Sequence, residues 1–139
     1  MSFKDAIALI TGGSSGLGWA TALRIAQAGG YAVILDLPKS DPTDKIAGLN
    51  LQDRISFSPG DVTSVADVQT AIEFTVAKHG RVDLGVSCAG IFLALSTHKE
   101  DMAADEKLRV LTKMTSINTG GSFNFLSQAV TKNVEIVHV

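Results

Sequence analysis

The stretch "AIALITGGSSGLG" (Ala6–Gly18) decides the fold, because it joins an apolar run to a glycine-rich turn. Its first six residues, ending at Thr11, are almost continuously apolar, which is typical of a strand buried on both faces of a parallel sheet. The glycines Gly12, Gly16 and Gly18 then predict a tight turn that leads into a helix. The stretch therefore predicts a strand, a turn and a helix at the start of an α/β domain.

Further apolar runs continue this pattern along the chain. We expect strands at Tyr31–Asp36, at Arg54–Pro59 and at Val134–Val139. We expect a further strand, followed by its exit loop, over Arg81–Gly90. Because helical patterns alternate with these strands, the connections should be right-handed crossovers. The alternation predicts a doubly wound parallel sheet, the Rossmann class of α/β fold.

The helical patterns each place apolar residues on one expected face. The first face consists of Leu17, Ala20, Leu23 and Ala26, and Gly29-Gly30 ends that helix. The second follows the capping pair Ser64 and Asp67 and consists of Val65, Val68, Ile72 and Val76. The third consists of Leu108, Leu111, Thr115 and Asn118, in a helix that continues through Phe123, Leu126 and Val130. We expect these faces to cover the sheet.

Composition narrows the class of protein. The 139 residues, 45% hydrophobic and 19% charged, are typical of one globular domain spanning 1–139. A net charge of −2 without a basic cluster argues against a nucleic-acid partner. One cysteine excludes an internal disulfide, and three separated histidines offer no metal spacing. Without a signal sequence or an apolar run near the ~20 residues of a membrane span, we expect a soluble protein with no membrane partner, cytoplasmic or mitochondrial and not secreted.

The glycine-rich turn matches two catalytic patterns. As G-x-S-x-G, Gly12–Gly16 would be the nucleophile elbow of a hydrolase, with Ser14 as the nucleophile. An elbow needs a central strand and an acid and a histidine from later loops, whereas this turn follows the first strand. His98 lies in a charged loop that continues through Lys99–Asp101, and His138 lies within a strand, so neither is a persuasive base. The position of the turn disfavours the hydrolase.

As a dinucleotide-binding turn, the same residues need a carboxylate at the end of the second strand. Asp36 is at that position, eighteen residues after Gly18, where it can reach ribose hydroxyls. Two alternatives remain at this point. The glycines could be a structural turn with Asp36 as a helix cap, or the chain could be an S-adenosylmethionine methyltransferase, which also has a glycine-rich first turn and an acid after the second strand.

Later motifs carry a family resemblance. The turn Thr11-Gly12-x-x-x-Gly16-x-Gly18 is followed by Gly60-Asp61-Val62, by Ser87-Cys88-Ala89-Gly90, and by Asn118, Gly121 and Phe123-Asn124. In order and spacing, over the whole chain, these motifs resemble the short-chain dehydrogenases/reductases. "GGSSGLG", "LDLP", "DVTS", "DVQTA", "GRVD" and "CAGI" most resemble the branch of type II 3-hydroxyacyl-CoA and 17β-hydroxysteroid dehydrogenases. The family's usual Asn-Asn-Ala-Gly is here Ser-Cys-Ala-Gly, although the cysteine is itself similar to that branch.

The resemblance implies a role for each motif in holding the cofactor NAD. The turn around the pyrophosphate would be Gly12, Ser15, Leu17 and Gly18, while Asp36 would bind the ribose, Asp61 and Val62 the adenine, and Cys88, Ala89 and Gly90 would lie against the cofactor. Asp36 should favour NAD over NADP, because a 2′-phosphate would meet its like charge. Lys39, beyond Leu37-Pro38, should face solvent. No basic neighbour activates the Cys88 thiol, so thiol chemistry is not expected.

Catalysis in this family, as the resemblance implies, uses a tyrosine, a lysine, a serine and an asparagine beside the nicotinamide. Only the asparagine is present, as Asn118, which would hold a proton-relay water. Tyr31, the single tyrosine, opens the second strand at the opposite end of the sheet, and no Tyr-x-x-x-Lys occurs. We therefore expect the cofactor half of the dehydrogenase, truncated at its C-terminus, which is inactive by itself.

Two function classes remain open. The first is an oxidoreductase that interconverts a secondary alcohol and a ketone, with a small-molecule substrate of the hydroxyacyl-CoA or hydroxysteroid type and a homo-oligomeric assembly. The second is a non-catalytic NAD-binding module or regulatory fragment.

Overall fold

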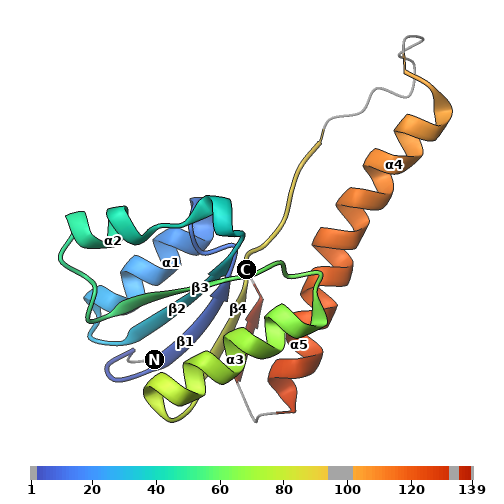
Figure 1. Ribbon diagram of the computed structural model, residues 1–139. Coiled ribbons are helices and arrows are strands. Elements are labelled where there is room, and N and C mark those ends of the chain that lie inside the picture. The colour runs from blue at the N-terminus through green and yellow to red at the C-terminus, as the bar shows by residue number, and fades with distance from the viewer. Residues whose placement is uncertain (1–2, 94–101, 132–134, 139) are drawn as a thin grey trace.

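Five parallel strands form one sheet in the order β3-β2-β1-β4-β5 in the computed structural model, which describes residues 3–93 and 102–131 and the backbone of 135–138 (Figure 1). The strands are β1 (Ile7–Thr11), β2 (Tyr31–Asp36), β3 (Ile55–Pro59), β4 (Leu84–Ser87) and β5 (Glu135–His138). The chain reverses its direction of travel across the sheet after β3, which is the doubly wound topology. The predicted fold class is confirmed.

Helical segments connect the strands. They are α1 (Gly16–Gln27), η1 (Pro38–Ser40), α2 (Thr43–Gly48), α3 (Val65–His79), α4 (Ala104–Thr115), η2 (Ser116–Gly121) and α5 (Ser122–Val130). The predicted long helix thus begins at Ala104 and contains a π-helical segment, η2. The predicted charged loop at 99–101 and His98 lie outside the described residues.

Two apolar clusters cover the two faces of the sheet, because neighbouring residues of a strand point to opposite faces. Ala8 and Ile10 of β1 pack with α1 and α2, whereas Leu9 between them packs with α3 and α5 (Figure 1). This two-sided burial explains the continuously apolar run in the sequence. A cavity lies at the carboxyl ends of the strands, between the layers that the helices form.

The predicted helix faces are only partly correct. The buried residues of α1 are Gly18, Ala22, Ile25 and Ala26, so of the expected face only Ala26 is buried, and Leu17 is 70% exposed. In α3 the buried residues are Val68, Ala71, Ile72 and Thr75, while Val65 and Val76 are exposed. The small residues Gly18 and Ala22 let α1 approach the sheet closely. In α3 the buried Thr75 hydroxyl is satisfied because it donates to the Ala71 carbonyl at 2.7 Å.

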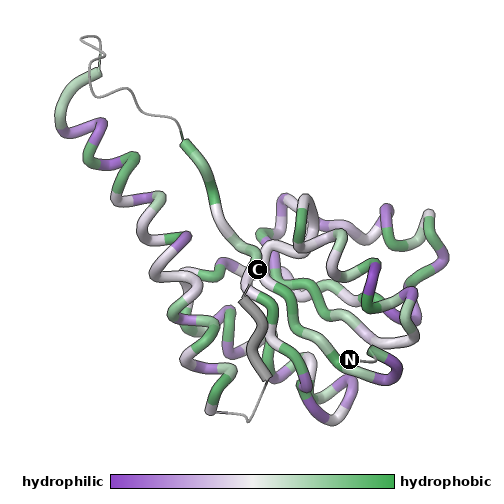
Figure 2. Tube along the Cα trace, turned by 180° about the vertical axis from the view of Figure 1, so that it is seen from behind, coloured by the Kyte–Doolittle hydropathy of each residue, from purple (hydrophilic) through white to green (hydrophobic). Residues whose placement is uncertain are grey.

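The third predicted face does not cover the sheet. No residue of α4 is buried, and Leu108 and Leu111 are exposed. Hydrophilic and hydrophobic residues alternate along this helix, which extends away from the sheet (Figure 2). Phe125 and Ala129 of α5 instead supply the buried contacts of this part of the chain.

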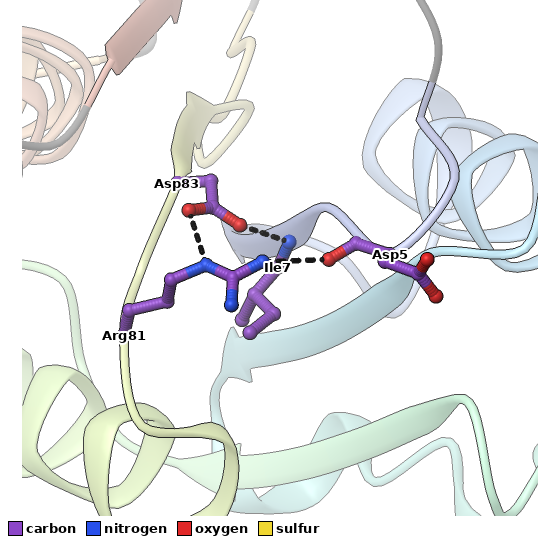
Figure 3. A network of polar contacts seen from close by, with 4 residues as sticks. All are labelled: Asp5, Ile7, Arg81 and Asp83. Atoms are coloured by element: carbon purple, nitrogen blue, oxygen red, sulfur yellow. Dashed lines mark hydrogen bonds and ion pairs between the residues drawn. The ribbon is translucent and has the colours of Figure 1, made fainter.

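A polar network fixes the other end of the sheet, where the strands begin (Figure 3). Arg81 donates to the Asp83 carboxylate at 2.7 Å and to the Asp5 carbonyl at 3.0 Å, and Ile7 N donates to Asp83 at 2.9 Å. Burial raises the pKa of the Asp83 carboxyl, but the bonds from Arg81 and Ile7 outweigh it and hold the pKa below its ordinary value. The network ties the start of β4 to the start of β1.

Tyr31 also lies at this end, as predicted. It pairs with Ile7 at the beginning of β1, its ring is 5.0 Å from that of His79, and the Arg54 guanidinium lies 4.6 Å from it. The single tyrosine is therefore separated from the C-terminal ends of the strands by the length of the sheet.

Candidate functional site

A cavity of about 510 Å³ opens at the carboxyl ends of the parallel strands. Open α/β sheets bind ligands at this edge, and the volume is within the range of about 300–1,000 Å³ that small-molecule sites occupy. All the predicted cofactor-binding residues line it: Gly12, Ser15, Leu17, Gly18, Asp36, Asp61, Val62, Cys88, Ala89 and Gly90. The lining also includes residues that were not predicted to bind the cofactor: Gly16, Leu35, Leu37, Lys39, Ser40, Gly60, Ile91 and Ile117.

The glycine-rich turn has no room for side chains at two of its positions. Gly12 has a φ of +64°, and a Cβ there would lie 2.7 Å from the backbone of Ala89. At Gly18 a Cβ would lie 2.3 Å from the carbonyl oxygen of Gly12. The turn therefore packs directly against the exit of β4 and exposes its backbone to the cavity. The first N–H groups of α1 lack partners within the helix and can meet an anion there.

The Thr11 hydroxyl joins the two central strands at the site. It is fully buried, and its Oγ1 accepts from Cys88 N at 3.3 Å and from Ala89 N at 3.2 Å. These bonds hold the exit of β4 beside the glycine-rich turn. The sequence placed Thr11 in the motif but did not predict this role, because it depends on β4 being the neighbour of β1.

Asp36 ends β2 as predicted, and its carboxylate faces the glycine-rich turn. Oδ2 accepts from Ser14 N at 3.0 Å, and Oδ1 accepts from the N–H of Leu37 at 2.8 Å. A carboxylate has about four acceptor positions, so these bonds fix its orientation while leaving positions for ribose hydroxyls. Asp36 lines the cavity from this position.

Ser14 is buried within the turn and does not line the cavity. The residue is 6% exposed, and its hydroxyl oxygen has no hydrogen-bond partner among the described residues. The serine of a nucleophile elbow instead presents its hydroxyl at the surface of the site. This burial counts against the hydrolase alternative.

Asp61 and Val62, which follow β3, also line the cavity. Asp61 Oδ1 accepts from Thr63 N at 2.8 Å and from the Thr63 hydroxyl at 2.7 Å, which stabilises a local turn. Val62 is 8% exposed, and its carbonyl accepts from Asn124 Nδ2 of α5 at 2.9 Å. The cap of α3 is Ser64, as predicted, since its hydroxyl accepts from Asp67 N. Asp61 is therefore not that cap.

The exit of β4 brings Cys88, Ala89 and Gly90 to the cavity. Burial raises the pKa of the Cys88 thiol, so the reactive thiolate is disfavoured at neutral pH. This agrees with the expectation that Cys88 has no thiol chemistry.

Asn118 lies in the π-helical segment η2 and is held by the backbone beyond β4. Its Oδ1 accepts from Ile91 N at 2.8 Å, and its Nδ2 donates to the carbonyl of Ile91 at 2.9 Å. The two bonds link η2 to the rim of the cavity, where Ile91 and Ile117 are lining residues. Asn118 itself is exposed and is not in the lining.

Two further basic residues lie near the turn. Lys39 is exposed to solvent, as predicted, but it also lines the cavity, which the sequence did not indicate. Lys45 of α2 donates from Nζ to the carbonyl of Ser14 at 3.0 Å and lies 4.2 Å from the centre of the Trp19 ring. No motif pointed to Lys45 or Trp19, because their contact depends on how α2 lies over α1.

The described part of the chain contains no group of three His, Cys, Asp or Glu residues placed to bind a metal ion. Within the same residues, no helix has both the length and the apolar character to cross a membrane.

The fold and the cavity define a Rossmann-type domain, and its residues fit a dinucleotide. Glycines at positions 12 and 18 let the turn pack closely on itself and on the exit of β4, where both residues line the cavity, and Asp36 ends β2 at the edge where this class of fold binds ribose. The family model for short chain dehydrogenases matches residues 6–136. The chain belongs to this family.

Known relatives agree with this assignment. The 3-hydroxyacyl-CoA dehydrogenase type-2 proteins of Bos taurus and Homo sapiens are each 42% identical over 125 residues, which is 90% of this chain and 47% of the relative. The crystal structure of a 3-ketoacyl-(acyl-carrier-protein) reductase from Brucella melitensis, complexed with NADH, is 29% identical with a TM-score of 0.79; the match covers 94% of this chain and 51% of that one. The chain thus spans about half the length of these relatives.

Proposed function

We propose that this chain is the cofactor-binding part of an NAD-dependent oxidoreductase that interconverts a secondary alcohol and a ketone. One observation carries the proposal: a single cavity joins the glycine-rich turn, Asp36, Asp61 and the exit of β4 at Cys88. Turns that bind phosphate and carboxylates that bind ribose are brought to the same place by the parallel sheet. Membership of a dehydrogenase family and a relative in complex with NADH support a nicotinamide cofactor.

NAD is the preferred cofactor in this proposal because of Asp36. Its carboxylate is fixed by Ser14 N and Leu37 N and lines the cavity, so it is oriented to accept bonds from ribose hydroxyls. A 2′-phosphate at that place would meet the same negative charge. Lys39 is the basic residue in the lining, and its exposed position limits how far it offsets this repulsion.

The bound cofactor would supply hydride transfer to or from a substrate carbon. The residues of this chain would bind and orient it: the backbone of the glycine-rich turn at the pyrophosphate, Asp36 at the ribose, and Asp61 with Val62 at the adenine. Asn118 would act at the rim, where its amide fixes the Ile91 backbone. By family resemblance Asn118 would also hold a water for proton transfer.

The proposed substrates are small 3-hydroxyacyl-CoA or hydroxysteroid alcohols and the corresponding ketones. The first class follows the name of the relatives that are 42% identical, and the second follows the resemblance of the motifs. We also propose that the working protein is a homo-oligomer in the cytoplasm or mitochondrion.

A second candidate function is a non-catalytic NAD-binding module or regulatory fragment. The position of Tyr31 favours it, because this is the single tyrosine of the 139 residues and it contacts His79 and Arg54 at the far end of the sheet. Residues 1–139 therefore place no phenol at the cavity. A positioned proton donor contributes about 10²–10⁴ in rate, so these residues alone should not turn over substrate.

Calorimetry followed by an absorbance assay separates these functions. Purified residues 1–139 are titrated with NAD and NADP, and NADH absorbance is then followed with 3-hydroxyacyl-CoA and hydroxysteroid substrates. The bovine 3-hydroxyacyl-CoA dehydrogenase type-2 is the positive control. We expect tighter binding of NAD than NADP and no measurable turnover. Absence of NAD binding would contradict the proposed function, and turnover comparable to the control would show that no phenol at the cavity is needed.

A further inference from the structure

Lys45 contacts the glycine-rich turn without lining the cavity. It belongs to α2, and its Nζ donates to the carbonyl oxygen of Ser14 at 3.0 Å. The same ammonium group lies 4.2 Å from the centre of the Trp19 ring, in the first turns of α1. Lys45 thus connects α2 both to the turn and to the helix that the turn begins, and it is absent from the residues that line the cavity.

The hydrogen bond from Lys45 fixes one peptide plane of the turn. In a trans peptide the C=O of one residue and the N–H of the next point in opposite directions. With the Ser14 carbonyl directed to Lys45, the N–H of Ser15 is directed away from Lys45, and Ser15 is a lining residue of the cavity. Lys45 therefore sets the direction of a backbone donor without itself touching the cavity.

Asp36 fixes the preceding peptide plane in the same way. Its carboxylate accepts from Ser14 N at 3.0 Å, so both peptide planes of Ser14 are held by charged side chains. The carboxylate comes from the end of β2 and the ammonium from α2, which is the next α-helix along the chain. Two side chains of opposite charge, Asp36 and Lys45, thus bind two successive peptide groups of the turn.

The geometry points to Lys45 and Trp19 as positioning residues that hold the glycine-rich turn in the shape that binds the cofactor pyrophosphate. This inference rests on the proposed function and deepens it. A charged donor on a carbonyl also polarises that peptide, which strengthens its N–H as a donor to phosphate. The Trp19 ring restrains the long lysine side chain near the carbonyl through a cation–π contact.

A purely structural role predicts a different outcome, and the chain contains a matched control for it. Lys78 of α3 makes contacts of the same two kinds, a hydrogen bond and a ring contact, since its Nζ donates to the Ser56 hydroxyl at 2.6 Å and lies 5.9 Å from the centre of the Phe74 ring. These residues are near the beginning of β3, and none of them lines the cofactor cavity. Loss of Lys78 should affect folding stability alone.

The test compares Lys45→Met, Lys45→Arg, Trp19→Leu and Lys78→Met with the wild-type protein. Calorimetry measures the dissociation constant of NAD, competition against NAD measures that of adenosine, which lacks the pyrophosphate, and melting temperature reports stability. We expect Lys45→Met to weaken NAD binding by about tenfold, which corresponds to about 1.4 kcal/mol, and to change adenosine binding by less than about twofold. Lys45→Arg should restore most of the affinity, because it keeps a charged donor and the ring contact.

The two remaining variants complete the design. Trp19→Leu keeps the lysine and should weaken NAD binding by about threefold, in line with a partly exposed cation–π contact of about 0.5–1 kcal/mol. Lys78→Met should leave both dissociation constants unchanged. The inference is overturned if Lys45→Met binds NAD as tightly as the wild type, or loses NAD and adenosine affinity equally. If the wild-type protein does not bind NAD, the proposed function fails instead.

Discussion

Replacement of Asp36 by asparagine should remove most of the preference for NAD over NADP. In the structure the two carboxylate oxygens each accept one backbone N–H, from Ser14 at 3.0 Å and from Leu37 at 2.8 Å, and the group lines the cavity. Asparagine offers one acceptor oxygen and places an NH₂ group against the second N–H. The variant therefore loses both the negative charge and one of the bonds that orient the side chain.

The size of the effect follows from two terms. A hydrogen bond to a charged group contributes about 1.5–3 kcal/mol, and because the amide replaces part of it we expect a loss of about 2 kcal/mol for NAD, or about 30-fold in the dissociation constant. Like charges 4 Å apart near a surface repel by about 4 kcal/mol, which exposure and salt reduce to about half. Relief of this repulsion should offset the lost bond, so NADP affinity should change by less than about fivefold.

Calorimetric titration of both cofactors at fixed ionic strength is the assay, with melting temperature as the measure of folding. Asp41→Asn is the matched control, because Asp41 also accepts a backbone N–H, from Thr43 at 2.8 Å, but does not line the cavity. An unchanged ratio of NAD to NADP affinity in Asp36→Asn, in a variant that melts like the control, would refute the role given to this carboxylate.

Three other substitutions or reactions test the site. Gly18→Ala forces a Cβ to within 2.3 Å of the Gly12 carbonyl oxygen, so it should lower the free energy of unfolding by about 1–3 kcal/mol and abolish NAD binding. Gly48→Ala is the control, because a Cβ at that position meets no atom within 4 Å and should not destabilise the fold. A denaturant titration measures both effects on stability. Asp61→Asn should weaken NAD binding by up to about 100-fold with little change in melting temperature, and a collapse of the melting temperature with unchanged affinity would assign Asp61 to folding alone. Because burial raises the pKa of the Cys88 thiol, labelling by a thiol reagent should be slow at neutral pH and should accelerate as the pH rises above the range for a free thiol. Bound NAD should slow the labelling, since Cys88 lines the cavity. Labelling as fast as that of a free cysteine would contradict this prediction.

Local sequence was sufficient to predict the strands and the glycines and carboxylate of the candidate site. The run that ends at Thr11 is apolar throughout because β1 is covered on both faces, so its burial is visible without any knowledge of its neighbours. Gly12, Gly18 and Asp36 were found by spacing, since backbone shape at a turn and the end of a strand are local properties. The motif order also led to the family, which the match over residues 6–136 confirms.

Helix faces were less predictable, because apolar spacing does not show which side approaches the sheet. In α1 the closest approach uses Gly18 and Ala22, which a search for large apolar residues passes over. In α3 the buried face includes Thr75, whose hydroxyl is satisfied within its own helix, while Val76 is exposed. Packing distance and internal hydrogen bonding decided these faces, and neither is a feature of hydrophobic periodicity.

The sequence by itself determined the class of fold and ten of the residues that line the cavity, since each depends on short-range pattern and on the rule that parallel strands end at one edge. Only the tertiary structure decided the contacts between segments that are far apart in the chain. Thr11 bonds to the exit of β4 because β4 lies beside β1, and Lys45 reaches the Ser14 carbonyl because α2 lies over the start of α1. Such contacts depend on the packing of whole elements, and no local pattern of residues specifies that packing.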